Sequence, residues 1–481
     1  MKRILASLMA LLLLAGCATK TPDNAETNTE QNVETSTDNK TETVITENYS
    51  ITETVNNTLQ ETFSYNNTEY DVSVSKRDLT GSYEEITGTI EFSGSEIKTA
   101  GSNVTVNGNT VKITAAGTYV LSGTGQGTVL IETDSDSKVQ LILNNLTLTS
   151  VDNAAILVGQ ADKVFITLPD NTVNTISDVS SYTAVYDDSD VDGAIFSKDD
   201  LTINGTGKLI VYGKKSHGIV CKDELTIAGS VIQISSVKSG INANDAVKLI
   251  NANVKADAGT DGIKADNSTD DTKGFIYINN SVINISSSDK GLQASAAVLI
   301  DSGSITISSA DDGINSDSII VINDGSINIK SSDDAIHADF ILEINDGTIS
   351  VDAAEGLEAT IVNLNGGNIT VNASDDGINA ASKTAGYTPS INVNGGSINV
   401  TMGPGDTDGF DSNGNIIING GNINISAQSA FDYDGIGQLN GGTVTVNGSQ
   451  ITQLTNQMMG GPGGMGGFGG QPGGGFGGPG H

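Results

Sequence analysis

The sequence predicts an all-β chain that coils into a right-handed parallel β-helix, and three observations support this fold class. First, short apolar runs rich in β-branched residues alternate with Gly, Asn and Asp, and no stretch has the period of about 3.6 residues that marks an amphipathic helix. Second, a motif of the form Asp-Gly-Ile recurs along the middle of the chain, often 22 residues apart, as at Gly218, Gly240 and Gly262. Third, Asn marks a second recurring turn, and fixed periods of this length are typical of solenoids.

Residues 1–16 have the features of a lipoprotein signal peptide. The positive pair Lys2-Arg3 precedes an apolar run that ends in Leu-Ala-Gly before Cys17, which is the form of a bacterial lipobox. We expect cleavage before Cys17 and lipidation of its thiol, so that an extracytoplasmic protein is anchored to the cell membrane, at the cell surface, by this lipid alone. The alternative is an ordinary signal peptide with a coincidental cysteine. No later stretch is apolar for long enough to span a bilayer.

The rest of the chain divides by composition into four parts. Residues 17–57 are mainly Thr, Asn, Glu and Asp, which is the composition of a disordered tether, and residues 58–102 have the alternation of a β lead-in or cap. The parallel β-helix is expected over 103–457, with insertions near 267–273, 381–389 and 402–407. Residues 458–481 consist almost entirely of Gly, Met, Pro and Phe and predict a disordered tail.

Aligning the recurring motif on its Gly gives columns of equivalent residues. We expect the Gly at a turn, the next residue in the core, and a small residue two positions further on. Cys221 falls in the small column, so it is predicted to be a packed core thiol rather than a nucleophile. At the second turn, Asn tolerates a left-handed backbone, and stacked Asn amides can bond from one coil to the next. The apolar column reads Ile195, Ile219, Ile241, Ile263, Leu292, Ile314, Ile336, Leu357, Ile378 and Phe410.

Acidic residues often precede the aligned Gly, and this acid column is the main candidate for chemistry. Equivalent positions of successive coils lie about 4.8 Å apart, so stacked carboxylates repel one another unless cations lie between them. Hard oxygen ligands suit calcium better than magnesium, because calcium accepts flexible coordination. The alternative is a solvated acidic edge without metal. The candidate calcium ligands of the column and its flanks are Asp261, Asp266, Asp311, Asp312, Asp333, Asp334, Asp375, Asp376 and Asp408.

A separate candidate calcium loop has the D-x-D-x-D-G form and contains Asp188, Asp190 and Asp192. Its twelfth position is Asp199 rather than Glu, and no helical pattern flanks it, so it is not an EF-hand. A local calcium loop at the mouth of a coil is the alternative that the sequence leaves.

The formal net charge of −35 restricts the partners of the chain. Such a field repels nucleic acid, anionic lipid and polyanionic glycans unless cations intervene, so nucleic-acid binding is excluded as a function. Divalent cations are the natural complement of this charge.

Catalysis by a polysaccharide lyase would need a cationic base beside bound calcium. The only arginines, Arg3 and Arg77, lie outside the predicted coils. Lys264 and Lys290 are placed within the acid column, and either is a candidate base with a lowered pKa. The alternative is that they relieve repulsion between the acids. The histidines at this corner have no second histidine nearby in register, which argues against a zinc site or a catalytic triad.

Several segments of the chain resemble a known family. With the Asp-Gly-Ile corners, they are similar to the carbohydrate-binding, pectate-lyase-like β-helix proteins of clostridia, typified by a cellulose- and polygalacturonate-binding surface protein. The resemblance covers about 100–450 and implies a right-handed parallel β-helix with bound calcium that binds plant cell-wall polysaccharide. The segments that carry it are 115–123, 139–144, 154–156, 164–168, 174–178 and 192–205.

The same resemblance locates calcium at particular corners and also marks departures from the family pattern. Corners at His217, Ser239 and Lys290 lack the acid, so we expect the metal ladder to be interrupted there. Trp is absent, which disfavours a flat aromatic platform for crystalline cellulose. The matching corners are those of Asp261, Asp312, Asp334, Asp376 and Asp408.

These observations predict a monomeric, non-catalytic lipoprotein of the cell surface that binds pectate-like or cellulose-like polysaccharide through calcium. A calcium-dependent pectate lyase with Lys264 or Lys290 as its base is the first alternative. A structural adhesin that calcium only stiffens is the second.

Overall fold

The computed structural model describes residues 60–457 except 66, 84, 188 and 406. These residues belong to one compact unit, Thr43–His481. The predicted signal peptide, the lipidation site Cys17, the tether, the Gly-rich tail and Asp188 lie outside the described residues. In the part of the chain that the structure describes, no helix has the length and apolar character needed to cross a membrane.

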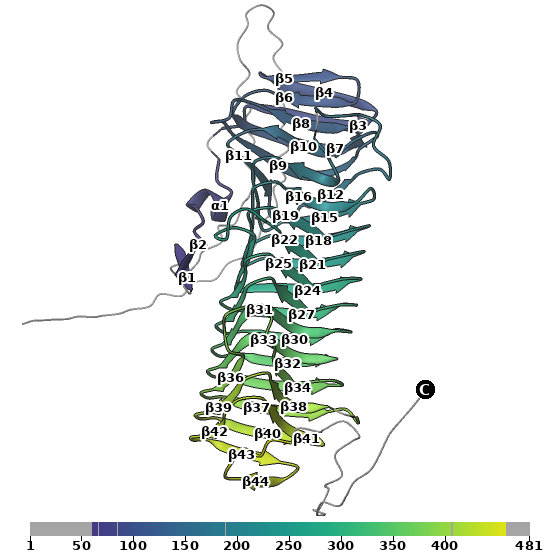
Figure 1. Cartoon of the computed structure of the whole chain (residues 1–481). Coiled ribbons are helices and arrows are strands. Elements are labelled where there is room, and N and C mark those ends of the chain that lie inside the picture. The colour runs from purple at the N-terminus through teal and green to yellow at the C-terminus, as the bar shows by residue number, and fades with distance from the viewer. Residues whose placement is uncertain (1–59, 66, 84, 188, 406, 458–481) are drawn as a thin grey trace, which may run out of the picture. The chain divides into compact units, whose positions relative to one another are not determined.

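The described chain is all-β, with one short helix, and most strands pair in parallel (Figure 1). Over most of the chain, a strand pairs with the strands three places before and three places after it, so the strands form three stacks that recur in a fixed order. This long, mainly parallel arrangement is consistent with the predicted solenoid. Coils of this kind leave few unpaired backbone groups, because each coil donates to and accepts from its neighbours.

The first stack carries the recurring motif. Its strands are β6 (Thr110–Ile113), β8 (Thr128–Glu132), β10 (Ile156–Gln160), β13 (Gly193–Ser197), β16 (His217–Cys221), β19 (Ile241–Ala243), β22 (Ile263–Ala265), β25 (Leu292–Ala294), β28 (Ile314–Ser316), β31 (Asp334–Ile344), β33 (Glu355–Leu364), β35 (Ile378–Ala380), β38 (Asp408–Ser412) and β41 (Ser429–Tyr433).

The second stack shares the long strands β31 and β33 with the first. Its other strands are β3 (Gly88–Gly94), β7 (Gly117–Gln126), β9 (Lys138–Thr149), β11 (Lys163–Leu168), β14 (Asp200–Gly205), β17 (Glu224–Ala228), β20 (Ala246–Ile250), β23 (Phe275–Asn279), β26 (Ala297–Ile300), β29 (Ile319–Ile322), β36 (Ser390–Val393), β39 (Asn415–Ile418) and β42 (Gly437–Leu439).

The third stack starts from the far end of β9 and follows the Asn turn. Its strands are β12 (Val173–Ser177), β15 (Lys208–Gly213), β18 (Val231–Ser236), β21 (Asn253–Ala258), β24 (Ser281–Ser287), β27 (Gly303–Ser308), β30 (Ser326–Lys330), β32 (Thr348–Ala353), β34 (Asn368–Ala373), β37 (Ser397–Met402), β40 (Asn422–Ser426) and β43 (Thr443–Val446).

The remaining elements lie at the ends of the stacks or on their outer surface. Antiparallel partners pair with the first and last coils, and a helix follows a short hairpin. These elements are β1 (Thr62–Tyr65), β2 (Thr68–Asp71), α1 (Lys76–Thr80), β4 (Glu96–Gly101), β5 (Val104–Asn107) and β44 (Ser449–Ile451).

The lead-in is held against the outer face of the second stack by both apolar and ionic contacts. Tyr70 is buried in a cluster with apolar side chains of that face. Lys248 is 1% exposed, and its Nζ donates to the carbonyl of Ser73 at 3.0 Å and pairs with Glu224 at 2.6 Å. Asp78 of α1 pairs with Lys163 at 3.0 Å. Buried charges therefore join this segment to the coils.

The predicted ladder of Asn amides is confirmed over the later coils. Each Nδ2 donates to the Oδ1 of the Asn before it at 2.8–2.9 Å. Glycines of the same turn, such as Gly347 and Gly367, have the left-handed φ that this position requires. Asn204 departs from the ladder, because its amide donates to the carbonyls of Arg77 and Asp78. The ladder consists of Asn323, Asn345, Asn365, Asn394, Asn419 and Asn440.

Candidate functional site

The register of the first stack brings the recurring motifs together as the sequence alignment predicts. Ile219 pairs with Ile241, Ile241 with Ile263, and the apolar column continues in this way to Phe431. These side chains are almost fully buried. Cys221 is buried and free, and burial raises the pKa of its thiol, so it is the predicted core thiol.

The aligned glycines are needed because neighbouring coils approach closely. Their φ angles lie outside the left-handed region. A Cβ at Gly240 would lie 2.6 Å from the carbonyl oxygen of Gly262, and one at Gly262 would lie 2.7 Å from that of Gly291. These contacts bring the residues just before the glycines, the acid column, side by side.

A second polar column, which we call the outer column, runs beside the acid column and was not identified from the sequence. It is formed by the residue two positions after each aligned Gly, between the apolar and the small residue. Alternation along a strand turns this residue outward, so a period-two pattern at the motif would have revealed it. The outer column consists of Asn242, Lys264, Gln293, Asn315, His337, Glu358, Asn379 and Asp411.

Three predicted ligands come together around Lys290. One carboxylate oxygen each from Asp311, Asp312 and Asp333 lies within 4.8 Å of the other two. The Nζ of Lys290 pairs with Asp312 at 2.7 Å and also contacts Asp311. Burial lowers the pKa of Lys290, but hydrogen bonds and ion pairs with the two aspartates outweigh burial, and the net shift is upward. Lys290 therefore neutralises the acids and is not placed to act as a neutral base.

The next coils form a network around His337. Its Nδ1 lies 2.7 Å from Asp334 and 2.8 Å from Glu358, and these groups have ligand atoms within 4.8 Å of one another. Lys383, from the insertion at 381–389, pairs with Glu358 at 2.9 Å. Burial lowers the pKa of His337, but its hydrogen bonds to Asp334 and Glu358 raise it to about 10. Two cations already balance these buried carboxylates.

Further along, the two columns contain the carboxylates of Glu355, Asp376 and Asp411. Burial raises the pKa of Glu355 to about 7, of Asp376 to about 6 and of Asp411 to about 7, and neighbouring carboxylates add to each shift. The structure gives none of these three carboxylates an ion pair with a described side chain. The Oδ1 atom of Asn379 is buried and accepts no hydrogen bond from a described residue. This oxygen-rich stretch, which also includes Asp408, has the donor chemistry of a calcium site.

The other predicted ligands are more dispersed. Asp261 is buried and accepts from Ser239 at 3.2 Å. Asp266 pairs with Lys264 at 3.1 Å. Asp375 lies exposed beside Asp376.

Asp190 and Asp192 of the D-x-D-x-D-G loop lie within the described residues, and each is near a different side chain. The side chain of Asp190 is 95% exposed and lies 4.0 Å from Lys215. Asp192 lies 3.5 Å from the ring of His217. Calcium in this loop stays a prediction.

A pocket of about 340 Å³ lies where the acid column is interrupted. We call it the gap pocket, because His217 and Ser239 stand there in place of acids. It spans the coils of β16, β19 and β22 and is also lined by Lys222, Lys238, Lys264, Asn242, Asn244, Asp261, Asp266 and Asp289.

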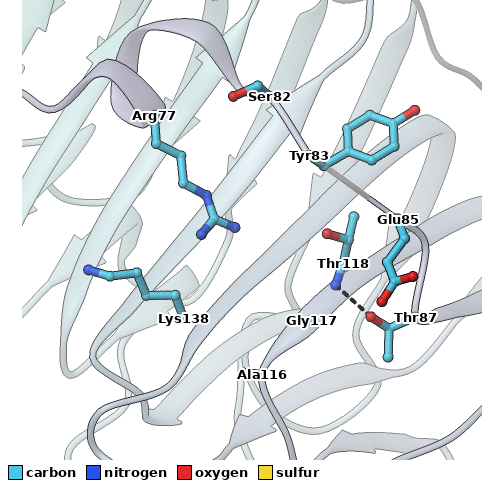
Figure 2. A pocket seen from close by; sticks show the side chains of 9 residues that line it. All are labelled: Arg77, Ser82, Tyr83, Glu85, Thr87, Ala116, Gly117, Thr118 and Lys138. Atoms are coloured by element: carbon cyan, nitrogen blue, oxygen red, sulfur yellow. Dashed lines mark hydrogen bonds between the residues drawn. The ribbon is translucent and has the colours of Figure 1, made fainter.

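A larger pocket of about 610 Å³ lies between the lead-in and the first coils. Figure 2 shows Arg77 and Lys138 on one side of this pocket and Tyr83 and Glu85 on the other. Arg77, which the sequence places outside the coils, packs 4.3 Å from the centre of the Phe165 ring and donates to a glutamine of β9. Lys138 pairs with an aspartate at 2.7 Å. Arg77 thus joins the lead-in to the coils, whereas the ion pair of Lys138 lies between two coils.

Comparison with known proteins adds three findings. The model of a family described as carbohydrate-binding domain-containing protein matches residues 107–359 and 342–455. A carbohydrate-binding domain-containing protein of Acetivibrio thermocellus is 33% identical over 128 residues, which are 26% of this chain and 45% of that protein, so the match spans under half of that relative. A solved gadolinium derivative of a polysaccharide lyase-like protein from C. thermocellum has 26% sequence identity and a TM-score of 0.46, and the match covers 54% of this chain and 97% of that one.

Proposed function

We propose, from the premise that this chain belongs to the family of carbohydrate-binding domain-containing proteins, that it binds acidic polysaccharide through calcium and does not cleave it. The family match covers most of the chain, and polysaccharide is therefore the expected partner. The observation that carries the calcium part of the proposal is the oxygen-rich stretch of the first stack.

The proposed architecture is a right-handed parallel β-helix with three strands per coil. The three parallel stacks support it. Right-handed connections are strongly preferred between parallel strands, because a right-twisted strand packs back onto its sheet only in that hand. In such a coil the acid and outer columns form one continuous face.

Calcium is proposed at the oxygen-rich stretch because its residues fit that ion. Asp376, Asp408 and Asp411 offer hard carboxylate oxygens, and Asn379 offers a buried carbonyl oxygen that no described donor satisfies. Burial, with neighbouring carboxylates, raises the pKa of Asp376 and Asp411, and neither forms an ion pair with a described side chain. A divalent cation would compensate them and keep them ionised at neutral pH.

Calcium also resolves the conflict between a chain of net charge −35 and an acidic ligand. Without a cation, the column would repel a uronate polymer. With calcium bound, a carboxylate of the polymer can approach the ion and the adjacent amides. The predicted lipid anchor at Cys17 would display this face outside the cell, and that part of the proposal rests on the sequence.

The test is retention of the protein on insoluble pectate and on cellulose, with calcium and with chelator. We expect retention on pectate in calcium and loss of retention in chelator. The double substitution Asp376→Asn/Asp411→Asn should weaken calcium-dependent retention. The matched control Asp324→Asn/Asp346→Asn removes the same charge from exposed positions on the Asn turn and should behave as the unaltered protein. Retention that chelator leaves unchanged would remove calcium from the proposal.

A calcium-dependent lyase is the second candidate, and one observation favours it. Lys264 lines the gap pocket together with Asp261 and Asp289, so a lysine lies near candidate calcium ligands. Its Nζ pairs with Asp266 at 3.1 Å. The ultraviolet absorbance of a pectate solution decides between binding alone and lyase activity, because cleavage by elimination forms unsaturated products that absorb. A rise in absorbance would support the lyase, and no rise would support binding without cleavage.

A further inference from the structure

We infer that the gap pocket binds the carboxylate of a uronic acid residue directly, through the ammonium groups of Lys222 and Lys238. This inference rests on the proposed function and goes beyond it, because it locates a direct anion-binding subsite away from the oxygen-rich stretch. It also names the two residues that would distinguish an acidic sugar from a neutral one.

The two lysines are cations without a counter-ion in a strongly acidic chain. Most lysines of the described residues pair with an aspartate or glutamate, and the third lysine of this pocket, Lys264, pairs with Asp266. Neither Lys222 nor Lys238 forms an ion pair with a described residue, and both are exposed at the same pocket. Unpaired positive charges beside one cavity are the complement that an anionic ligand requires.

The backbones that carry these lysines are held by neighbouring coils. The backbone N–H of Lys222 donates to the carbonyl of Ser197 at 2.8 Å, and the Nζ of Lys222 lies 5.7 Å from the centre of the Phe196 ring. The backbone N–H of Lys238 donates to Ser216 at 2.8 Å, and its carbonyl accepts from Gly259 at 3.1 Å. Fixed backbones reduce the ordering cost of binding.

Two positions of the acid column carry no acid at this pocket, which lowers the negative charge that an anion meets there, although Asp261, Asp266 and Asp289 also line it. Ser239 occupies an acid position, and its Oγ contacts Asp261 at 3.2 Å. His217 occupies another, and its Nδ1 accepts from the backbone N–H of Ser239 at 3.2 Å. Burial lowers the pKa of His217, the nearby Asp192 raises it, and the charges of Lys238 and Lys222 lower it, with a net shift downward.

The remaining groups of the pocket favour a sugar over a small inorganic anion. Asn242 and Asn244 add neutral amides that can bind hydroxyl groups, and Asp261 and Asp289 add hydrogen-bond acceptors. The volume of about 340 Å³ lies within the range of ligand sites and exceeds what a single small ion fills. A ligand with one carboxylate and several hydroxyl groups matches this lining.

The experiment compares binding of purified full-length variants to galacturonate oligosaccharides in calcium, by titration calorimetry. The variant Lys222→Ala/Lys238→Ala should bind at least about tenfold more weakly, since each charged hydrogen bond that is lost accounts for about that factor. The variant Lys222→Arg/Lys238→Arg should retain binding. The control Lys208→Ala/Lys330→Ala removes the same net charge at lysines without a described ion pair outside the pocket and should bind as the unaltered protein. Thermal midpoints verify that every variant is folded.

Three further ligands separate the possible outcomes. Methyl-esterified galacturonate oligosaccharides and cello-oligosaccharides lack free carboxylates, so any binding of them should be equal in the alanine variant and the unaltered protein. Equal weakening toward dextran sulfate would show a general anion site and would overturn the assignment to uronate. Unchanged affinity of the alanine variant for galacturonate would overturn the inference and leave the proposed function intact. Failure of the unaltered protein to bind any of these polysaccharides would instead refute the proposed function, and the inference with it.

Discussion

Replacing Lys290 by Met tests whether a built-in cation holds the acid column together. The Asp312 side chain is 6% exposed and the Lys290 side chain 23% exposed, and their charged atoms are 2.7 Å apart. At an effective dielectric constant of about 20, Coulomb's law gives a gross attraction of roughly 6 kcal/mol at this distance. Desolvation of both groups offsets part of that attraction.

The net effect follows from what the substitution leaves behind. Removing one partner of a buried pair costs about 3–5 kcal/mol, because the other charge stays buried. The contact with Asp311 is more exposed, at 38%, and adds little. We therefore expect Lys290→Met to lower the free energy of unfolding by about 3 kcal/mol, at the lower end of that range. Added calcium should restore part of the loss, because three carboxylate oxygens converge at this place within 4.8 Å.

The assay is urea unfolding at neutral pH, followed by circular dichroism, in chelator and then in calcium. Both midpoint and slope are compared, since long repeat arrays do not always unfold in one step. Lys330→Met is the matched control, because Lys330 is exposed and no described acid pairs with it. An equal, small effect of the two substitutions would refute the reasoning about the buried pair. Loss of stability that calcium does not reduce would refute the idea that metal can replace the ammonium group.

Three other predictions concern the core, the Asn ladder and pH. Ile314→Ala, at a fully buried position, should cost about 2–5 kcal/mol of unfolding free energy in urea titrations. Asn365→Ala removes two amide hydrogen bonds of 2.8 Å at an exposed turn and should lower the thermal midpoint with a cost of about 1–2 kcal/mol, whereas Asn365→Asp should keep only the accepted bond. Burial, followed by a hydrogen bond with Asp245, raises the pKa of Asp223 from 3.8 to about 7. The folded state therefore favours the protonated form of Asp223, so stability should fall as the pH rises from about 4 to about 7. Asp223→Asn should flatten that part of the profile of thermal midpoint against pH.

Much of the fold could be predicted because its determinants are local and repeat. The alternation within Ile314-Asn315-Ser316 decides which side chains face the core, and the same alternation in every coil aligns the strands. The register follows, since a shift by one residue would turn the apolar column outward. The Asn turns of the later coils were predictable for the same reason, because those coils place the amide at the same point.

The composition of the site was harder to predict because its members come from unrelated parts of the chain. His337 was visible in the sequence, but its role as a cation between Asp334 and Glu358 depends on two coils and on an insertion that brings Lys383 to the same glutamate. Lys290 was a candidate base until its distances to two carboxylates showed it to be their counter-ion. Such roles depend on side-chain distances of a few ångströms, and these distances cannot be read from the spacing of residues along the chain.

The sequence by itself determined the solenoid period, the inward apolar column and the position of the acids, because each depends on residues within a single repeat. Only the tertiary structure decided which acids are already neutralised, where Arg77 and the lead-in pack, and that Lys222 and Lys238 meet at one pocket. The physical reason is that charge compensation depends on distance and burial between coils. Neighbours separated by about 22 residues or more lie side by side only once the chain has folded.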